Sequence, residues 1–189
     1  MKRAALDEVA EGDLASLSLR RVAKRAGVSP TAPYRHFKSR DALLAAVAAD
    51  GFRERTRLTR EAIHSLADRP LERFLEAGVR YVLFAHEHPA YYAIMTAPEL
   101  IDTMPYPELA EAAAESGAIL MSAIRDSQHA GLLQEGDPRD IAAAAWASVH
   151  GLASLISTGQ LKTLGYELDD VEALARRITG TLVRQISAP

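Results

Sequence analysis

Residues 18–37, SLRRVAKRAGVSPTAPYRHF, constrain the fold of this 189-residue chain more than any other segment. Apolar residues recur at three- and four-residue spacing over 19–26, which is typical of an amphipathic helix. Gly27 follows as a left-handed helix end, where any side chain would be penalised. Ser29 and Pro30 then suit the start of a second helix. Two short helices joined by a tight turn predict a helix-turn-helix, a motif whose second helix lies in the DNA major groove.

The same helical spacing continues along the chain, and no alternating strand pattern interrupts it. Capping residues such as Ser39 and the pair Asp137-Pro138 mark further helix starts. We predict an all-α fold with nine helices, over residues 2–11, 19–26, 30–37, 39–65, 71–88, 90–96, 107–130, 138–158 and 169–186. A short turn is also expected near 99–103.

Charge is unevenly distributed along the chain. Residues 1–60 hold 13 lysines and arginines against 7 aspartates and glutamates, whereas residues 61–189 hold 9 against 18. Such asymmetry indicates that one end faces a polyanion, although charge alone fits a chance cluster of solvated side chains equally well. Together with the motif, it favours DNA. We therefore expect a helix-turn-helix DNA-binding domain over 1–45 and a larger helical bundle over 46–189.

Other classes of protein are disfavoured. No apolar run is long enough to span a membrane, and the acidic start lacks the apolar core of a secretory signal. The chain has no cysteine, which excludes disulfides and thiolate chemistry, so a cytoplasmic location is expected. We find no nucleophile elbow or phosphate-binding loop, and His86 and His88 point to different helical faces. We expect no enzyme activity, no metal and no cofactor.

The run LRRVAKRAGVSPTAPYRHFKSRDALL, over 19–44, resembles the DNA-binding region of the tetracycline-repressor (TetR) family of transcriptional regulators. A second match, Trp146 followed by His150-Gly151, resembles the Trp-His-Gly signature of one C-terminal subclass of that family. HPAYY at 88–92 agrees with the same subclass. These matches lie at both ends of the chain, so the resemblance covers nearly all of it.

The resemblance implies DNA contacts residue by residue. Thr31 and Tyr34 would face the groove and the backbone, and Arg35 is the candidate for a guanine edge. The other positions would hold phosphates or start the reading helix. The full set is Ser18, Arg20, Arg21, Ser29, Thr31, Tyr34, Arg35, His36, Lys38 and Arg40. For any single one of these, the alternative is a solvated surface side chain.

The resemblance also implies a homodimer that binds a palindromic operator in double-stranded DNA. The last two predicted helices would pair with their copies in a second subunit, because small residues and a sustained apolar stripe favour close helix packing. The residues expected at this interface are Ala145, Val149, Leu174, Ile178, Leu182 and Ile186. The alternative is that the stripe packs within its own chain.

Aromatic and methionine side chains concentrate in the middle of the chain, and such side chains line adaptable apolar cavities. The resemblance implies an effector pocket there, and the scarcity of charge favours a small apolar or aromatic effector. The ligand-binding candidates are Tyr81, Tyr92, Met95, Met121, Trp146 and His150. For each, the alternative is plain core; for His150 it is a core histidine bonded to a backbone carbonyl.

The leading hypothesis is therefore a bacterial regulator, a repressor released by an effector and associated with the nucleoid when bound to DNA. The alternative is a DNA-binding protein of the same fold that is constitutive or controlled by a protein partner. Family members usually carry a longer first helix preceded by basic residues, whereas only 1–11 precedes the motif here. Either the true start lies upstream, or part of a DNA contact is lost.

Overall fold

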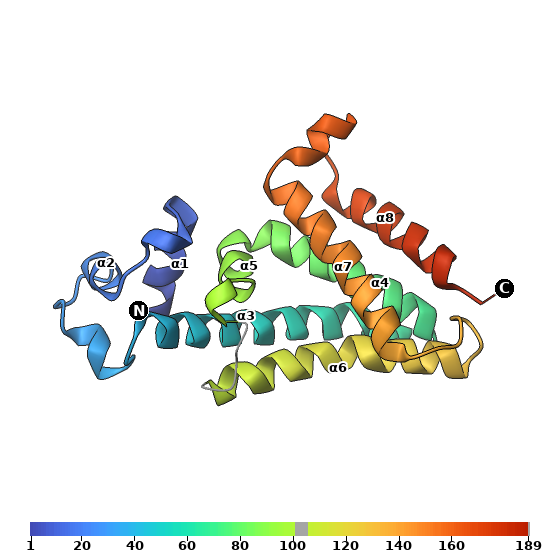
Figure 1. Cartoon of the computed structure of the whole chain (residues 1–189), viewed down its shortest axis with the longest axis horizontal. Helices are drawn as coiled ribbons and strands as arrows, with labels where there is room; N and C mark the ends of the chain where they lie inside the picture. Colours follow the sequence, from blue (N-terminus) through green and yellow to red (C-terminus); the bar gives the residue numbers. More distant parts are fainter. Residues whose placement is uncertain (101–105, 189) are drawn as a thin grey trace. The chain divides into compact units, whose positions relative to one another are not determined.

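The computed structural model describes residues 1–100 and 106–188, and within them all regular structure is helical (Figure 1). The eight α-helices are α1 Lys2–Glu11, α2 Leu19–Arg25, α3 Arg40–Ile63, α4 Pro70–Glu87, α5 Pro89–Met95, α6 Pro107–His129, α7 Pro138–Ser157 and α8 Val171–Ile186. Short 3-10 helices are η1 Leu14–Ser16, η2 Ala32–Arg35, η3 His64–Leu66, η4 Pro98–Leu100 and η5 Gln160–Leu164. The predicted all-α class is confirmed. Beyond Leu100, the turn expected near 99–103 lies outside the described residues.

Helix starts follow local chemistry that the sequence displays. Four helices, α4 to α7, begin at a proline, whose fixed φ suits a first helical position and whose missing N–H is not needed there. Side chains cap three helices as predicted: Ser18 accepts from Arg21 N at α2, Ser39 accepts from Ala42 N at α3, and Asp137 accepts from Arg139 N at α7, next to its proline. Residue type alone therefore sets where these helices begin.

Contacts divide the chain into two units, Met1–Glu54 with His88–Ala114, and Arg55–Glu87 with Glu115–Pro189. Two of the three boundaries fall inside α3 and α6, so each of these helices contributes residues to both units, and the third falls between α4 and α5. The functional division at residue 45 stays a prediction. Within the described residues, no helix is long and apolar enough to cross a membrane.

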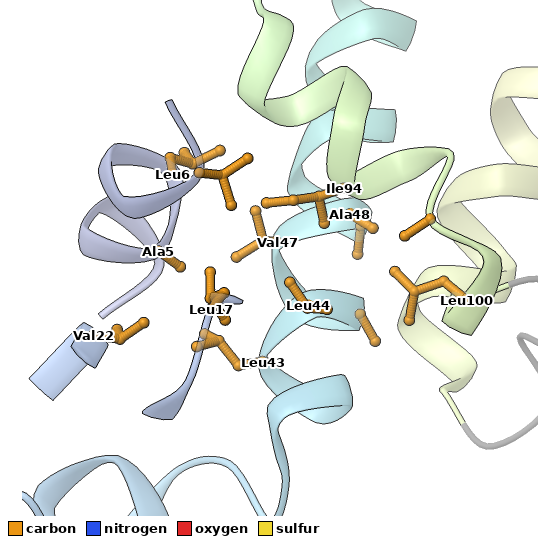
Figure 2. Packing of buried hydrophobic residues seen from close by; sticks show 14 of the residues in the cluster. Ala5, Leu6, Leu17, Val22, Leu43, Leu44, Val47, Ala48, Ile94 and Leu100 are labelled. Carbon is orange, nitrogen blue, oxygen red and sulfur yellow. The ribbon is translucent and has the colours of Figure 1, made fainter. Parts of the chain in front are cut away.

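The first unit has a core that joins α1, α2, α3 and α5 (Figure 2). Val22 of α2, Leu43 and Val47 of α3 and Ile94 of α5 are fully buried, each stabilising the fold by about 1.5–3 kcal/mol. Gly51 lets α5 approach, because a Cβ there would lie 2.6 Å from the Met95 sulfur. The helix-turn-helix thus rests on a core that extends beyond the motif itself.

In the second unit, α4 packs against both α7 and α8 (Figure 1). One cluster joins Val79 and Val82 of α4 to Leu152 of α7 and Leu174 of α8. A further cluster, around Ile124, joins α6 to the same helices. The apolar stripe of α8 is therefore covered largely by its own chain.

Candidate functional site

The turn of the motif is built as predicted, but its second helix is different. Gly27 has a φ of 67°, in the left-handed region, and ends α2. The α-helix predicted over 30–37 is instead the 3-10 helix η2, Ala32–Arg35. Pro33 is the reason, because it has no N–H to bond to the carbonyl of Ser29 four residues earlier. Ala32 N–H takes that carbonyl instead, at 3.0 Å, which tightens the turn.

Ser29 does not cap this helix, contrary to expectation. Its hydroxyl lies 3.3 Å from the hydroxyl of Thr31, and Thr31 is the residue that precedes η2, with no side-chain cap bond. Both hydroxyls are exposed, so both remain accessible to a partner. The segment is anchored from beneath by Pro33, which is fully buried. A rigid anchor under exposed polar groups holds them in a fixed position.

The predicted reading residues around η2 face solvent. Tyr34 is 56% exposed, and Arg35, His36 and Lys38 are also exposed. The ring of His36 lies beside that of Phe37, with centroids 6.5 Å apart. The structure thus brings phenol, guanidinium, imidazole and ammonium groups together on one short segment. These groups match what phosphate and base-edge contacts require.

The four cations of α2 divide between two faces. Arg21 Nε donates to Glu8 Oε2 at 2.7 Å, and Arg25 Nε donates to Glu8 Oε1 at 2.5 Å. Arg25 also pairs with Glu11, so α1 supplies the carboxylates for both arginines. Arg20 and Lys24 are four residues apart on another face and point to solvent. Arg21 and Arg25 therefore pair with the carboxylates of α1, although Arg21 is itself half exposed, and the other two cations point to solvent. The DNA contact predicted for Arg21 stays a prediction.

Glu8 is the centre of this arrangement. Its side chain is only 9% exposed, and both of its oxygens accept from arginine. The hydrogen bond from Arg25 is the main reason that the pKa of Glu8 lies below its usual value. Burial acts in the opposite direction and raises the pKa, whereas the hydrogen bond from Arg21 lowers it further. The carboxylate therefore stays charged and keeps both arginines in place.

Ser18 and Arg40, both predicted to bind phosphate, also form hydrogen bonds within the chain. The Ser18 hydroxyl accepts from Arg21 N at 3.3 Å, which caps α2 and leaves its own O–H able to donate. Arg40 donates from Nε to the carbonyl of Leu17 at 3.1 Å and from Nη2 to that of Leu14 at 2.8 Å. Arg40 thus positions the turn around η1, and its phosphate contact stays a prediction.

The cations that remain form a distinct set. Within the described residues, no anionic partner is found for Arg20, Lys24, Arg35 or Lys38, and we call these four the open cations. By contrast, Lys2 and Arg53 both pair with Asp50. The predicted set did not include Lys24. Lys24 lies four residues after Arg20, and this spacing places the two on the same face of a helix. The sequence does not show that Arg21 and Arg25 bind Glu8 and that Arg20 and Lys24 do not.

Three of the ligand-binding candidates come together in the second unit. Tyr81 Oη lies 3.0 Å from His150 Nδ1, and Trp146 Nε1 donates to the same Tyr81 oxygen at 3.3 Å. The guanidinium of Arg55 lies 4.9 Å from the centre of the Tyr81 ring. Trp146 is nevertheless 58% exposed. The three side chains therefore form a hydrogen-bonded aromatic cluster, and their role in ligand binding stays a prediction.

The other three ligand candidates are described within their own units. Tyr92 and Met95 belong to the first unit, where Met95 packs over Gly51 as part of that core. Met121, on α6, is partly buried. Core packing, the alternative considered for each residue, describes Met95. A ligand role for the three stays a prediction.

The residues predicted at a dimer interface pack internally. Ala145, Val149, Leu174 and Ile186 are buried within the single chain, and Ile178 and Leu182 pack against the same clusters. The reason is that α8 lies against α4 and α7 of its own chain. Their place in a dimer stays a prediction.

Comparison with known proteins identifies the family. One family model, "Bacterial regulatory proteins, tetR family", matches residues 3–47, and another, "Tetracyclin repressor-like, C-terminal domain", matches residues 74–182, more than half of the chain. The chain belongs to the TetR family. The motif of this TetR-family protein is thus the DNA-binding domain of a transcription regulator.

Solved structures share the fold of this chain. A protein with unknown function from Rhodococcus sp. RHA1 is 29% identical, with a TM-score of 0.77, over 98% of this chain and 95% of that one. A TetR family transcription regulator from Marinobacter aquaeolei VT8 is 16% identical, with a TM-score of 0.76, over 100% of this chain and 94% of that one. The second likeness shows the fold alone. No curated protein matches the chain.

The role of the open cations can be tested on this TetR-family protein without knowing its operator, because phosphate contacts do not depend on the DNA sequence. Arg20→Gln and Lys38→Gln should each reduce the slope of log affinity against log salt for duplex DNA by about 0.9, since each lost phosphate contact releases one fewer set of counterions. Fluorescence anisotropy of a labelled duplex over a range of salt measures the slope.

The matched control is Arg69→Gln, which removes the same charge from an arginine paired with Glu72 at 2.9 Å. This variant should keep the wild-type slope. Wild-type slopes in both Arg20→Gln and Lys38→Gln would remove the open cations from the DNA interface.

Proposed function

We propose that this TetR-family protein is a repressor that binds a palindromic operator as a homodimer and releases it when a small molecule binds. The observation that carries the DNA contact is the set of open cations beside exposed Thr31 and Tyr34. Cations without an intramolecular anion are free to bind phosphate, which positions the protein on the duplex. Arg35 and Tyr34 then read base edges.

The homodimer forms through the exposed face of α7. Ala144, Ala147, Gly151 and Ser154 are spaced by three and four residues, so they share one face of the helix, and Leu155 lies beside them. A Cβ added at Gly151 would meet nothing of its own chain within 4 Å. Small side chains permit a second helix to approach closely. A twofold axis through this face gives the symmetry that a palindromic operator requires.

The effector, a small apolar or aromatic molecule, binds at Tyr81, Trp146 and His150. The hydrogen bonds among these three residues support this site and the proposed membership of the Trp-His-Gly subclass. Release requires that the effector bind the DNA-free conformation more tightly than the DNA-bound one. A shift of α3, which carries residues of both units, changes the separation of the two reading segments. The protein acts in the bacterial cytoplasm, on the nucleoid.

Footprinting of the purified protein on the DNA upstream of its own gene tests the proposed function. We expect protection of two half-sites whose centres are about 10 base pairs, one helical turn, apart. Protection that is lost when either half-site is scrambled would support the dimer. The absence of any protected region there or in a selected pool of random duplexes would contradict the proposal.

Gly151→Leu tests the dimer face separately from folding. The new side chain points into open space in the single chain, so folding should be kept, while close approach of a second α7 should be blocked. Light scattering should give the mass of one chain for the variant and of two chains for the wild type. Operator affinity should fall about tenfold or more as the second half-site contact is lost.

The control is Gly117→Leu, at an exposed glycine of α6 that also has nothing within 4 Å of its Cβ position. This variant should remain a dimer with wild-type affinity. A Gly151→Leu protein that is still dimeric would place the interface elsewhere.

A further inference from the structure

The second unit contains a pocket of about 510 Å³, distinct from the Tyr81 cluster. Residues from the end of α3, from η3, α4 and α8 line it. Its apolar wall includes Leu66, Leu71, Leu75 and Val183. This volume lies within the range of about 300–1,000 Å³ that is typical of small-molecule sites. The pocket is therefore large enough for an extended apolar body.

One wall of the pocket is an ion-pair group around Glu76, which is 7% exposed. Arg176 Nη1 donates to Glu76 Oε2 at 2.7 Å, and its other nitrogens donate to Glu172. Arg80 Nε donates to Glu76 Oε1 at 2.8 Å. Both carboxylate oxygens of Glu76 are thus already bound, and so is every nitrogen of Arg176.

Arg80 is different, because only its Nε is used. Among the described residues, its terminal nitrogens Nη1 and Nη2 have no partner, and the side chain is one-third exposed. A guanidinium end of this kind presents two parallel N–H groups, which match the two oxygens of a carboxylate. The pocket therefore has donors ready for an anion beside its apolar wall.

A cationic ligand has no comparable site. Both oxygens of Glu76 accept from arginine, and Glu72, the other carboxylate of the lining, pairs with Arg69 at 2.9 Å. At the buried Glu76, a bound cation would have to displace one of these arginines, whereas Glu72 is 56% exposed. A bound anion would displace none of these arginines. At the buried end of the pocket, beside Glu76 and Arg80, charge complementarity thus favours an anionic head group.

We propose that this pocket binds an amphipathic carboxylate, with its apolar chain along Leu66, Leu71, Leu75 and Val183 and its carboxylate on the terminal nitrogens of Arg80. This goes beyond the proposed function, because the binding requires neither DNA nor the Tyr81 cluster. A failure of operator release would leave this site intact, and a failure of binding here would leave the operator contact intact.

Calorimetry with decanoate as the probe, below its micelle concentration and without DNA, tests the site. Decanoate should bind the wild type at least tenfold more tightly than decan-1-ol, which has the same chain without the charge. Arg80→Gln should weaken decanoate binding by about tenfold or more, the loss expected for a charge-assisted bidentate contact, and leave decan-1-ol unchanged. Absence of decanoate binding, or equal affinity for the two probes, would overturn the proposal.

Two further variants separate binding from folding. Arg177→Gln alters an arginine that lies over the Tyr166 ring and does not line the pocket, so decanoate affinity should be unchanged. Leu66→Trp enlarges a side chain of the lining and keeps Arg80, so decanoate binding should be lost because the pocket is filled. Wild-type decanoate binding in Arg80→Gln or in Leu66→Trp would overturn the proposal, as would an equal loss in Arg177→Gln.

Discussion

The helix-turn-helix depends on one buried carboxylate. Glu8 of α1 binds Arg21 and Arg25 of α2, and Glu11 reinforces the second pair. Desolvation makes a buried carboxylate unfavourable unless its oxygens are bound, and here both accept from arginine. The same bonds fix the rotation of α2 about its axis. Because that rotation is fixed, Arg20 and Lys24 face solvent. Arg21 and Arg25 therefore stabilise the fold, whereas Arg20 and Lys24 are available to bind a partner.

Much of this domain could be predicted from local chemistry. The cap at Ser18, the left-handed turn at Gly27 and the helical spacing between them required no knowledge of tertiary structure. The nature of the second helix was only partly accessible. A proline near a helix start disturbs the first turn, and the missing N–H of Pro33 accounts in this way for the 3-10 geometry of η2, whereas the burial of Pro33 beneath the segment depends on the tertiary fold. The bonds of Arg40 to two carbonyls likewise depend on contacts distant in sequence.

In the second unit, the sequence indicated which residues are apolar but not what covers them. The stripe of α8 predicted a partner, and that partner is largely α4 of the same chain. An amphipathic pattern specifies a face and not its neighbour. For the same reason, the pocket around Glu76 and Arg80 could not be predicted. Its lining comes from four elements, and only the fold shows that, among the described residues, the terminal nitrogens of Arg80 have no hydrogen-bond partner.

NMR of the arginine Nε–H groups, with and without operator DNA, tests most directly which cations of the motif bind Glu8 and which bind DNA. Arg→Lys variants assign each signal. The signals of Arg20 and Arg35 should shift on adding the duplex, whereas those of Arg21 and Arg25 should keep their positions, because their bonds to Glu8 persist. Equal shifts of Arg21 and Arg25 would show that the arginines bound to Glu8 also meet DNA, and would contradict the assignment of Arg21 and Arg25 to the fold alone.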